Sequence, residues 1–186
     1  SVVEPDSTMT FLTVGQGDAT LIQTRDNHRI LVDCGPKEGG IIDQLQHHLG
    51  FLARRIDILI VTHGDADHFG GCTEVMRIYK PQKVIINGVV DSDNQDYSQF
   101  LATARNFGEI IPGIAGMTIS MTEYELHILH PEPGIWGREL ADDNDQSLVI
   151  DVHGPRNRVL LAGDIPMYTE WDLIRRYPSL QASVLK

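Results

Sequence analysis

One stretch constrains the fold more than any other: residues 57–71, which read D-I-L-I-V-T-H-G-D-A-D-H-F-G-G. Its first six residues form a largely apolar run of strand length, as expected where both faces of a sheet are covered. Four residues that can bind a metal ion follow directly, namely His63, Asp65, Asp67 and His68. A strand that ends at Thr62 delivers them to the carboxyl end of a sheet, where α/β proteins usually build their sites.

Two interpretations of this cluster are open. In the first, it is an exposed acidic turn that has a histidine at each end by chance. In the second, a cation lies among the four side chains, because two aspartates held close together without one would repel each other. Gly64 and Ala66 are small enough to let the four side chains converge. Imidazole nitrogen and carboxylate oxygen suit zinc, manganese or iron, and we favour the metal site.

Along the rest of the chain, strands come first and then alternate with helices. Short apolar or alternating runs predict strands, and apolar residues three or four apart predict helices. We expect one domain over residues 1–186, of the α/β or layered α+β class. The expected strands are residues 9–14, 19–24, 29–34, 57–62, 83–87, 117–122, 124–130, 146–152 and 158–162. A turn that contains His153 is expected between the last two strands. The expected helices are residues 39–49, 72–79, 97–107 and 168–177.

The net charge limits the classes of partner. The 186 residues carry a formal charge of -11, which argues against a protein that coats nucleic acid through a basic surface. It does not exclude an enzyme that acts on phosphates, because a bound metal ion makes a carboxylate-rich site attractive to anions. No run of residues approaches the roughly 20 apolar residues needed to span a bilayer.

The termini and the two cysteines bear on processing and compartment. The first residues lack the basic and apolar segments of a secretory signal and lack an initiator Met, so we expect a processed chain or an excised piece. Cys34 and Cys72 have no C-x-x-C spacing. We expect two buried, reduced thiols, with a disulfide as the alternative, and the compartment stays open.

The cluster at residues 63–68 resembles the H-x-H-x-D-H signature of the metallo-β-lactamase fold, with Asp65 in place of the second histidine. Together with F-L-T-V-G-Q-G-D-A at residues 11–19, it resembles the hydrolase domain of ComEC-type DNA-uptake proteins and their stand-alone relatives. The resemblance runs from about residue 9 to the last residue and implies an αββα sandwich. Further segments resemble these proteins in order: L-V-D-C-G at 31–35, I-L-H-P at 128–131, N-D-Q-S-L-V at 144–149 and L-L-A-G-D at 160–164.

The resemblance implies a metal-binding role for each matched residue. His63 and Asp65 would bind a first metal ion. Asp67 and His68 would bind a second, and Asp164 would bridge the two. The implied cofactor is therefore one or two divalent ions, zinc or manganese, with iron as a further option.

Four other residues lie near the expected site. Asp33 resembles the family aspartate that braces the metal-binding loop, here residues 63–68, through hydrogen bonds and binds no metal itself. Asp18, in the G-Q-G-D turn, either faces the site or hydrogen-bonds its own backbone. His130 ends a strand and could approach the site. Asp145 either replaces the histidine that the third family motif normally supplies or stabilises its own loop.

Two departures from the family pattern bear on the metal sites. The histidine of the third motif has no obvious equivalent, and Asp65 replaces another, so the first site is expected to be weaker, to prefer manganese or to stand empty. Relatives continue after a segment like A-S-V-L-K at residues 182–186 into a strand ending in H-H-G-S, which supplies the last ligand of the second site. We therefore expect a chain truncated at its C-terminus, or an incomplete second site.

The resemblance implies a metal-dependent hydrolase, specifically a nuclease or phosphodiesterase acting on DNA. A metal ion would make hydroxide available at neutral pH, and Asp67 would orient the attacking water. We expect no membrane contact from this segment itself, although it could belong to a larger membrane protein. A ComEC-type parent implies the periplasmic or extracellular face, and otherwise the cytoplasm.

Three alternatives to a DNA-uptake nuclease remain. The first is a hydrolase of a small substrate, such as a lactone, thioester or nucleotide, and the second is an effector nuclease domain of a larger defence protein. The third is a metal-binding interaction domain with impaired catalysis. A positively charged groove around residues 54–55 or 156–158 would favour nucleic acid.

Overall fold

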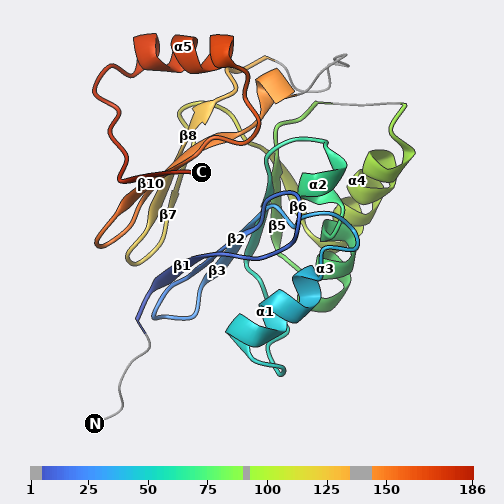
Figure 1. The fold of residues 1–186 in the computed structure, drawn as a ribbon. Helices are drawn as coiled ribbons and strands as arrows, with labels where there is room; N and C mark the ends of the chain where they lie inside the picture. The colour runs from blue at the N-terminus through green and yellow to red at the C-terminus, as the bar shows by residue number, and fades with distance from the viewer. Residues whose placement is uncertain (1–5, 90–92, 135–143) are drawn as a thin grey trace.

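Two β-sheets pack face to face, and helices cover the outer face of each (Figure 1). The computed structural model describes residues 6–89, 93–134 and 144–186. The layers follow the order helices, sheet, sheet, helix, so the expected αββα sandwich is confirmed. Within the described ranges, no helix is long and apolar enough to cross a membrane.

The first sheet has six strands in the order β1-β2-β3-β4-β5-β6. Its first three strands pair antiparallel, whereas β3 to β6 run parallel. Five of the expected strands form β1 to β5 of this sheet. The sixth strand, β6 at the edge, was not expected. The strands are β1 (Thr8–Phe11), β2 (Thr20–Gln23), β3 (Arg29–Val32), β4 (Ile58–Val61), β5 (Lys83–Ile86) and β6 (Glu109–Pro112).

Helices α1 to α4 cover the outer face of the first sheet (Figure 1). Each of the longer ones buries apolar residues spaced three or four apart, for example Tyr97, Leu101 and Ala104 of α4. Asn94 caps α4, because its side chain accepts a hydrogen bond from the backbone N–H of Tyr97. The helices are α1 (Ile41–Leu49), α2 (Ala66–Phe69), α3 (Cys72–Tyr79) and α4 (Gln95–Phe107).

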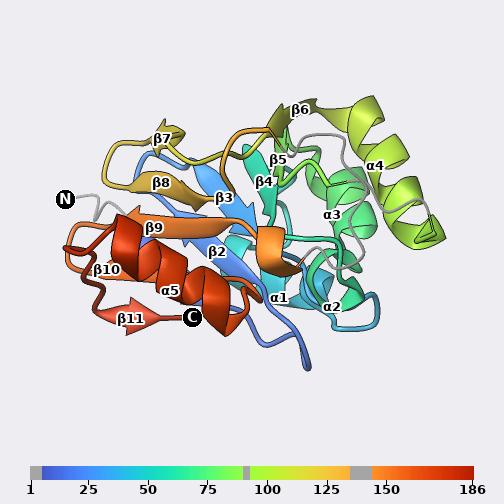
Figure 2. The same ribbon diagram turned by 90° about the horizontal axis from the view of Figure 1, so that it is seen from above.

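The second sheet has five strands in the order β11-β10-β9-β8-β7. Strands β7 to β10 pair antiparallel, and β11 runs parallel to β10. Helix α5 (Met167–Arg176) lies across the outer face of this sheet (Figure 2), where Leu173 packs on Leu129 and Val149. The strands are β7 (Thr118–Ser120), β8 (Glu125–His130), β9 (Val149–His153), β10 (Arg158–Leu161) and β11 (Val184–Leu185).

Strand β4 contributes to both apolar layers of the first sheet. Leu59 and Val61 pack against the helices, whereas Ile60 packs between the two sheets, in the same cluster as Leu126 and Ile150. This explains the nearly continuous apolar run that precedes His63, since neither face of β4 meets water.

The two cysteines form a disulfide between Cys34 and Cys72, so the expectation of reduced thiols is wrong. Linear spacing gave no sign of the pairing, because Cys34 follows β3 while Cys72 begins α3. Backbone hydrogen bonds bring the two segments together: Cys34 N–H donates to the carbonyl of His68 at 2.7 Å, and Gly71 N–H donates to that of Gly35 at 3.0 Å. The cross-link therefore lies directly beside the loop that follows β4.

Candidate metal centre

The loop after β4 continues into the short helix α2, and this separates the four clustered residues. His63 and His68 are buried, whereas Asp65 and Asp67 are partly exposed. Successive residues of a helix point about 100° apart around its axis. Asp67 and His68 are neighbours in α2. Among the described residues around this loop, the ligand atoms within 4.8 Å of one another belong to His63, His68 and Asp164, and the roles of Asp65 and Asp67 as ligands stay predictions.

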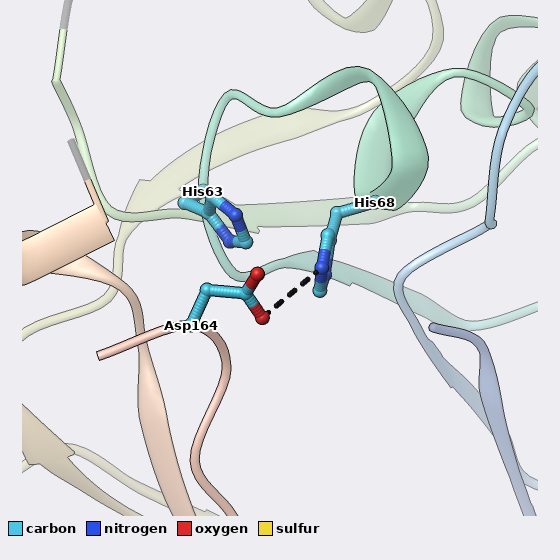
Figure 3. Close-up of side chains that lie close together, drawn as sticks. All are labelled: His63, His68 and Asp164. Atoms are coloured by element: carbon cyan, nitrogen blue, oxygen red, sulfur yellow. Dashed lines mark ion pairs between the residues drawn. The ribbon is translucent and has the colours of Figure 1, made fainter. Parts of the chain in front are cut away.

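Three side chains do converge: His63, His68 and Asp164 (Figure 3). Each offers a ligand atom, and these atoms all lie within 4.8 Å of one another. Nε2 of His68 lies 3.3 Å from Oδ1 of Asp164, and the two imidazole rings have centroids 4.1 Å apart. The histidines follow β4 of the first sheet and Asp164 follows β10 of the second, so the sequence expectation that distant strand ends meet here agrees with the structure.

A buried hydrogen-bond network fixes the orientation of both imidazoles. The Thr62 hydroxyl donates to Oδ2 of Asp33 at 2.8 Å and accepts from Nδ1 of His63 at 3.0 Å. Nδ1 of His68 donates to the same oxygen of Asp33 at 2.9 Å. With both Nδ1 atoms engaged as donors, the network assigns Nε2 as the coordinating atom of each ring.

Asp33 is held in place by its own backbone and by that of β4. Its φ is 58°, a left-handed conformation that aspartate tolerates better than most residues. Its Oδ1 accepts a hydrogen bond from the backbone N–H of Thr62 at 2.8 Å, and its own N–H donates to the carbonyl of Ile60 at 2.8 Å. Asp33 thus hydrogen-bonds both the segment that follows β4 and His68, and its bracing role in metal binding stays a prediction.

The site attracts positive charge. Burial by itself lowers the pKa of His68, but the hydrogen bond to Asp33 and the negative charges of Asp33, Asp164 and Asp18 raise this pKa to about 9. The same carboxylates that stabilise a proton on the imidazole would stabilise a cation in its place.

The donor set fits a divalent metal ion. Nε2 of His63 is buried and has no hydrogen-bond partner among the described residues. Oδ2 of Asp65 lies 3.5 Å from it, without the geometry of a hydrogen bond. A buried nitrogen with an available lone pair beside a second imidazole and a carboxylate is the arrangement expected of a zinc or manganese ligand.

Asp67 and Asp18 flank the group. Asp67 lines a cavity of about 770 Å³, and Gln16, Lys37 and Arg77 line the same cavity. Asp18 lines a much smaller cavity together with Asp33 and Thr62, and its carboxylate pairs with the ammonium of Lys186. The negative charge of Asp18 acts on His68, and which of its two expected roles it has stays a prediction.

His130 and Asp145 are occupied elsewhere. Nε2 of His130 donates to the backbone carbonyl of Asp145 at 2.7 Å, and burial lowers the pKa of this imidazole. Oδ2 of Asp145 accepts a hydrogen bond from the Tyr168 hydroxyl at 2.9 Å. Neither side chain belongs to the His63, His68 and Asp164 group, which in the described part of the chain has no histidine from the third motif.

Sequence reasoning missed three residues that shape the site. Thr62 joins Asp33 to His63, and the only signal was a hydroxyl at the last position of an apolar run. Gly17 lies against the carbonyl of Asp67, where an added Cβ would come within 2.0 Å of the oxygen. Lys186 pairs with Asp18, 168 positions away, a contact that no local pattern could indicate.

The basic pairs considered for a nucleic-acid groove lie away from the centre. Arg55 pairs with Asp57 at 2.8 Å, at the start of β4, about 25 Å from His63 along an extended strand. Arg158, at the start of β10, bonds to Asp151 through Nε at 2.8 Å. Arg156 lines a cavity that includes none of His63, His68 and Asp164. In the described part of the chain, the positively charged groove that would favour nucleic acid is therefore not seen beside these residues.

Several known proteins are similar to this chain. ComE operon protein 3 of Bacillus subtilis (strain 168) is 26% identical over 193 residues, which cover 95% of this chain and 24% of that protein. Competence protein ComA of Neisseria gonorrhoeae is 27% identical over 180 residues, covering 95% of the chain and 22% of that protein. Anti-Pycsar protein Apyc1 of Bacillus phage 010DV004 is 34% identical over 144 residues, which cover 73% of this chain and 47% of that protein. The chain thus spans about a quarter of the length of the two bacterial relatives.

The fold is shared with solved structures. A metallo-β-lactamase with a HARLDQ motif from Cronobacter sakazakii superposes with a TM-score of 0.62 at 16% identity, covering 98% of this chain and 76% of that one. The model of the metallo-β-lactamase superfamily matches residues 12–185. This fold implies divalent metal binding and supports a metal-dependent hydrolase as the general class. Together with the convergence of His63, His68 and Asp164, these findings place the chain in the metallo-β-lactamase superfamily.

Proposed function

We propose that this chain is a metal-dependent phosphodiesterase that hydrolyses DNA. The observation that carries the proposal is the buried pair of Nε2 atoms on His63 and His68, aimed at the same point as the Asp164 carboxylate. A divalent ion in such a site lowers the pKa of a bound water towards about 7 and neutralises charge that develops on a phosphate.

The chain's own residues prepare the site for that ion. Thr62 and Asp33 hold both imidazoles with Nε2 directed inward. Asp164 supplies a negative charge from the second sheet, and Asp65 is close enough to His63 to join the ligands. We propose Asp67 as a further ligand and as the group that orients the attacking water from the cavity it lines.

Two observations support DNA as the substrate. One relative is named a competence protein, in agreement with the ComEC-type resemblance of the G-Q-G-D and metal-loop segments. In addition, Lys37 and Arg77 lie in the cavity beside Asp67 and could pair with phosphates of a substrate. The Cys34–Cys72 disulfide supports action in an oxidising compartment, outside the cytoplasm.

The test is hydrolysis by the purified chain after chelation and metal replacement. Single- and double-stranded DNA, labelled at either end, would be incubated with the metal-free protein and with zinc or manganese. Cleavage should require the added metal, and Asp67→Asn should abolish it without changing the unfolding midpoint. Asp43→Asn, on the exposed face of α1, is the matched control and should cleave normally. Full turnover by Asp67→Asn would exclude this mechanism.

A substrate panel separates the proposal from its alternatives. Lactones, thioesters and small nucleotides would be offered to the same metal-loaded protein. Cleavage of a small substrate with no cleavage of DNA would retain the hydrolase and reject the nuclease. Stoichiometric metal binding with no hydrolysis of any substrate would instead identify an interaction domain.

A further inference from the structure

A second group of metal-ligand side chains gathers on the outer face of the second sheet. Glu125 and His127 are two apart on β8 and so share a face, and His153 on β9 lies directly opposite Glu125. Their ligand atoms all lie within 4.8 Å of one another. The expectation of a turn at His153 is wrong, since this residue is the last of β9. Only this pairing brings it beside the other two.

The two histidines are oriented as ligands usually are. Nδ1 of His127 lies 3.1 Å from the Thr118 hydroxyl on β7, while its Nε2 lies 3.4 Å from Oε2 of Glu125. Nε2 of His153 donates to Oδ2 of the buried Asp151 at 2.8 Å. One nitrogen of each ring is thus engaged by a neighbour, and the other can coordinate: Nε2 of His127 and Nδ1 of His153. Carboxylate or hydroxyl partners of this kind fix the rings of metal-binding histidines.

Asp151 is held by two neighbouring side chains: Arg158 on β10 and His153 on β9 donate hydrogen bonds to its carboxylate. Arg158 contacts both carboxylate oxygens, through Nε at 2.8 Å and Nη2 at 2.5 Å. The arginine balances the charge of Asp151, so the carboxylate of Glu125 remains to offset part of the charge of an incoming cation.

The spacing suits a tetrahedral ion. Ligand atoms placed 2.0–2.1 Å from a zinc ion lie about 3.3 Å from one another. The separation of Nε2 of His127 from Oε2 of Glu125 is already 3.4 Å. The rings of His127 and His153 meet edge to face with centroids 4.6 Å apart, so neither ring blocks the other's approach to a common ion. All three side chains are partly exposed and can be reached from solvent.

We propose that Glu125, His127 and His153 form a second binding site for a divalent transition-metal ion, zinc by its donor chemistry, with a fourth position open to water or an anion. Two histidines with one glutamate form a common three-ligand zinc set. The site lies at the far end of β9 from the metal loop, because Leu148 donates its N–H to the Thr62 carbonyl and His153 is about 15–20 Å further along the strand. It is therefore independent of the proposed hydrolase centre.

Zinc chloride alone is the probe, titrated by calorimetry, with metal content measured after gel filtration. The main centre is the group formed by His63, His68 and Asp164. In a His68→Ala/Asp164→Ala variant, which lacks two of these three side chains, we expect one zinc ion per chain to remain bound. Adding Glu125→Gln or His153→Asn should weaken this binding beyond the ten- to hundredfold loss typical of outer-shell changes. Thr118→Val should weaken it about tenfold and Thr118→Ser should restore it.

Matched controls keep the result decisive. His47 and His48 are neighbouring exposed histidines on α1, so a His47→Asn/His48→Asn variant should bind zinc normally. In the otherwise intact protein, His153→Asn should lose one zinc while the main centre stays loaded, which covers the case in which the double variant does not fold. In the His68→Ala/Asp164→Ala variant, imidazole NMR signals of His127 and His153 should shift together at one equivalent of zinc. Equal zinc stoichiometry and affinity in His153→Asn and in the His47/His48 control would overturn the proposal.

Discussion

Replacing Gly17 with alanine should damage both the fold and the metal centre. The φ of Gly17 is 119°, and an added Cβ would lie 2.0 Å from the carbonyl oxygen of Asp67 and 2.9 Å from its Cβ. The oxygen has little room to move, because it also accepts a hydrogen bond from the backbone N–H of Asp18 at 3.3 Å. The Gly17→Ala protein must therefore displace α2, which carries His68.

Gly15 supplies the matched control. Its φ is 83°, also in the left-handed region, but no heavy atom lies within 4 Å of an added Cβ. Both substitutions incur the backbone cost of about 1–2 kcal/mol, and only Gly17→Ala adds an overpacking cost of about 1–3 kcal/mol. We expect Gly15→Ala to lose about 1–2 kcal/mol of unfolding free energy and Gly17→Ala about 2–5 kcal/mol.

Two measurements check this expectation. Urea unfolding of the metal-free proteins gives the stability difference, and zinc titration gives the effect on the centre, where Gly17→Ala should bind about ten- to a hundredfold more weakly. Gly15→Ala should bind zinc like the unaltered protein. Equal stability losses in the two variants, with zinc affinity unchanged, would refute the reasoning and reduce the G-Q-G-D segment to a simple turn.

Three further predictions concern the surroundings of the centre. Asp33→Asn should weaken metal binding about ten- to a hundredfold in a zinc titration. The reason is that the substitution removes the negative charge beside His68 and changes the acceptor of two hydrogen bonds. A zinc affinity equal to that of Asp43→Asn would contradict this prediction. The Cys34–Cys72 disulfide closes a sequence separation of 38 residues, so its removal in Cys34→Ser/Cys72→Ser should lower the free energy of unfolding in urea by about 4 kcal/mol. The unfolding midpoint of this variant should not respond to reductant. A midpoint equal to that of the unaltered protein would show that the cross-link does not stabilise the fold. Burial lowers the pKa of His130; the charge of Arg176 adds to this effect, and the Asp145 carbonyl and the carboxylates of Glu132 and Asp145 oppose it. Near and below the unfolded pKa of about 6.5, the unfolded state therefore binds more protons than the folded state, so stability falls as the pH drops from about 7 to 5. His130→Gln, which keeps a hydrogen-bond donor, should show a shallower fall of the thermal unfolding midpoint over this pH range.

The sequence predicted the main elements because their apolar patterns are strong. The helices at 72–79 and 97–107 and the strand at 83–87 appear within a residue or two of their expected bounds. The edge strand β6 was missed, since E-I-I-P at residues 109–112 is four residues long and ends in proline. Its strand character comes from parallel pairing with β5, which local propensity does not encode.

The site was predictable in its ligand types and less so in their directions. His63, His68 and Asp164 lie close together, because a motif fixes which residues follow a strand, and their role as ligands stays a prediction. The direction of Asp67 depends on whether residues 66–69 form a turn or a helix, and four residues carry too little periodicity to decide. The pairing of Cys34 with Cys72 depends on how β3 approaches α3, which is a property of the packed layers.

The hydrogen bond from Leu148 to the Thr62 carbonyl has a mechanical consequence. It joins the layers at the same end where the two imidazoles of one sheet face the carboxylate of the other. An ion held by all three acts as a non-covalent cross-link, so sliding one sheet over the other by an ångström would change every coordination distance at once. Of the three described side chains, two follow the first sheet and one follows the second, so loading the ion should make both sheets unfold as one unit.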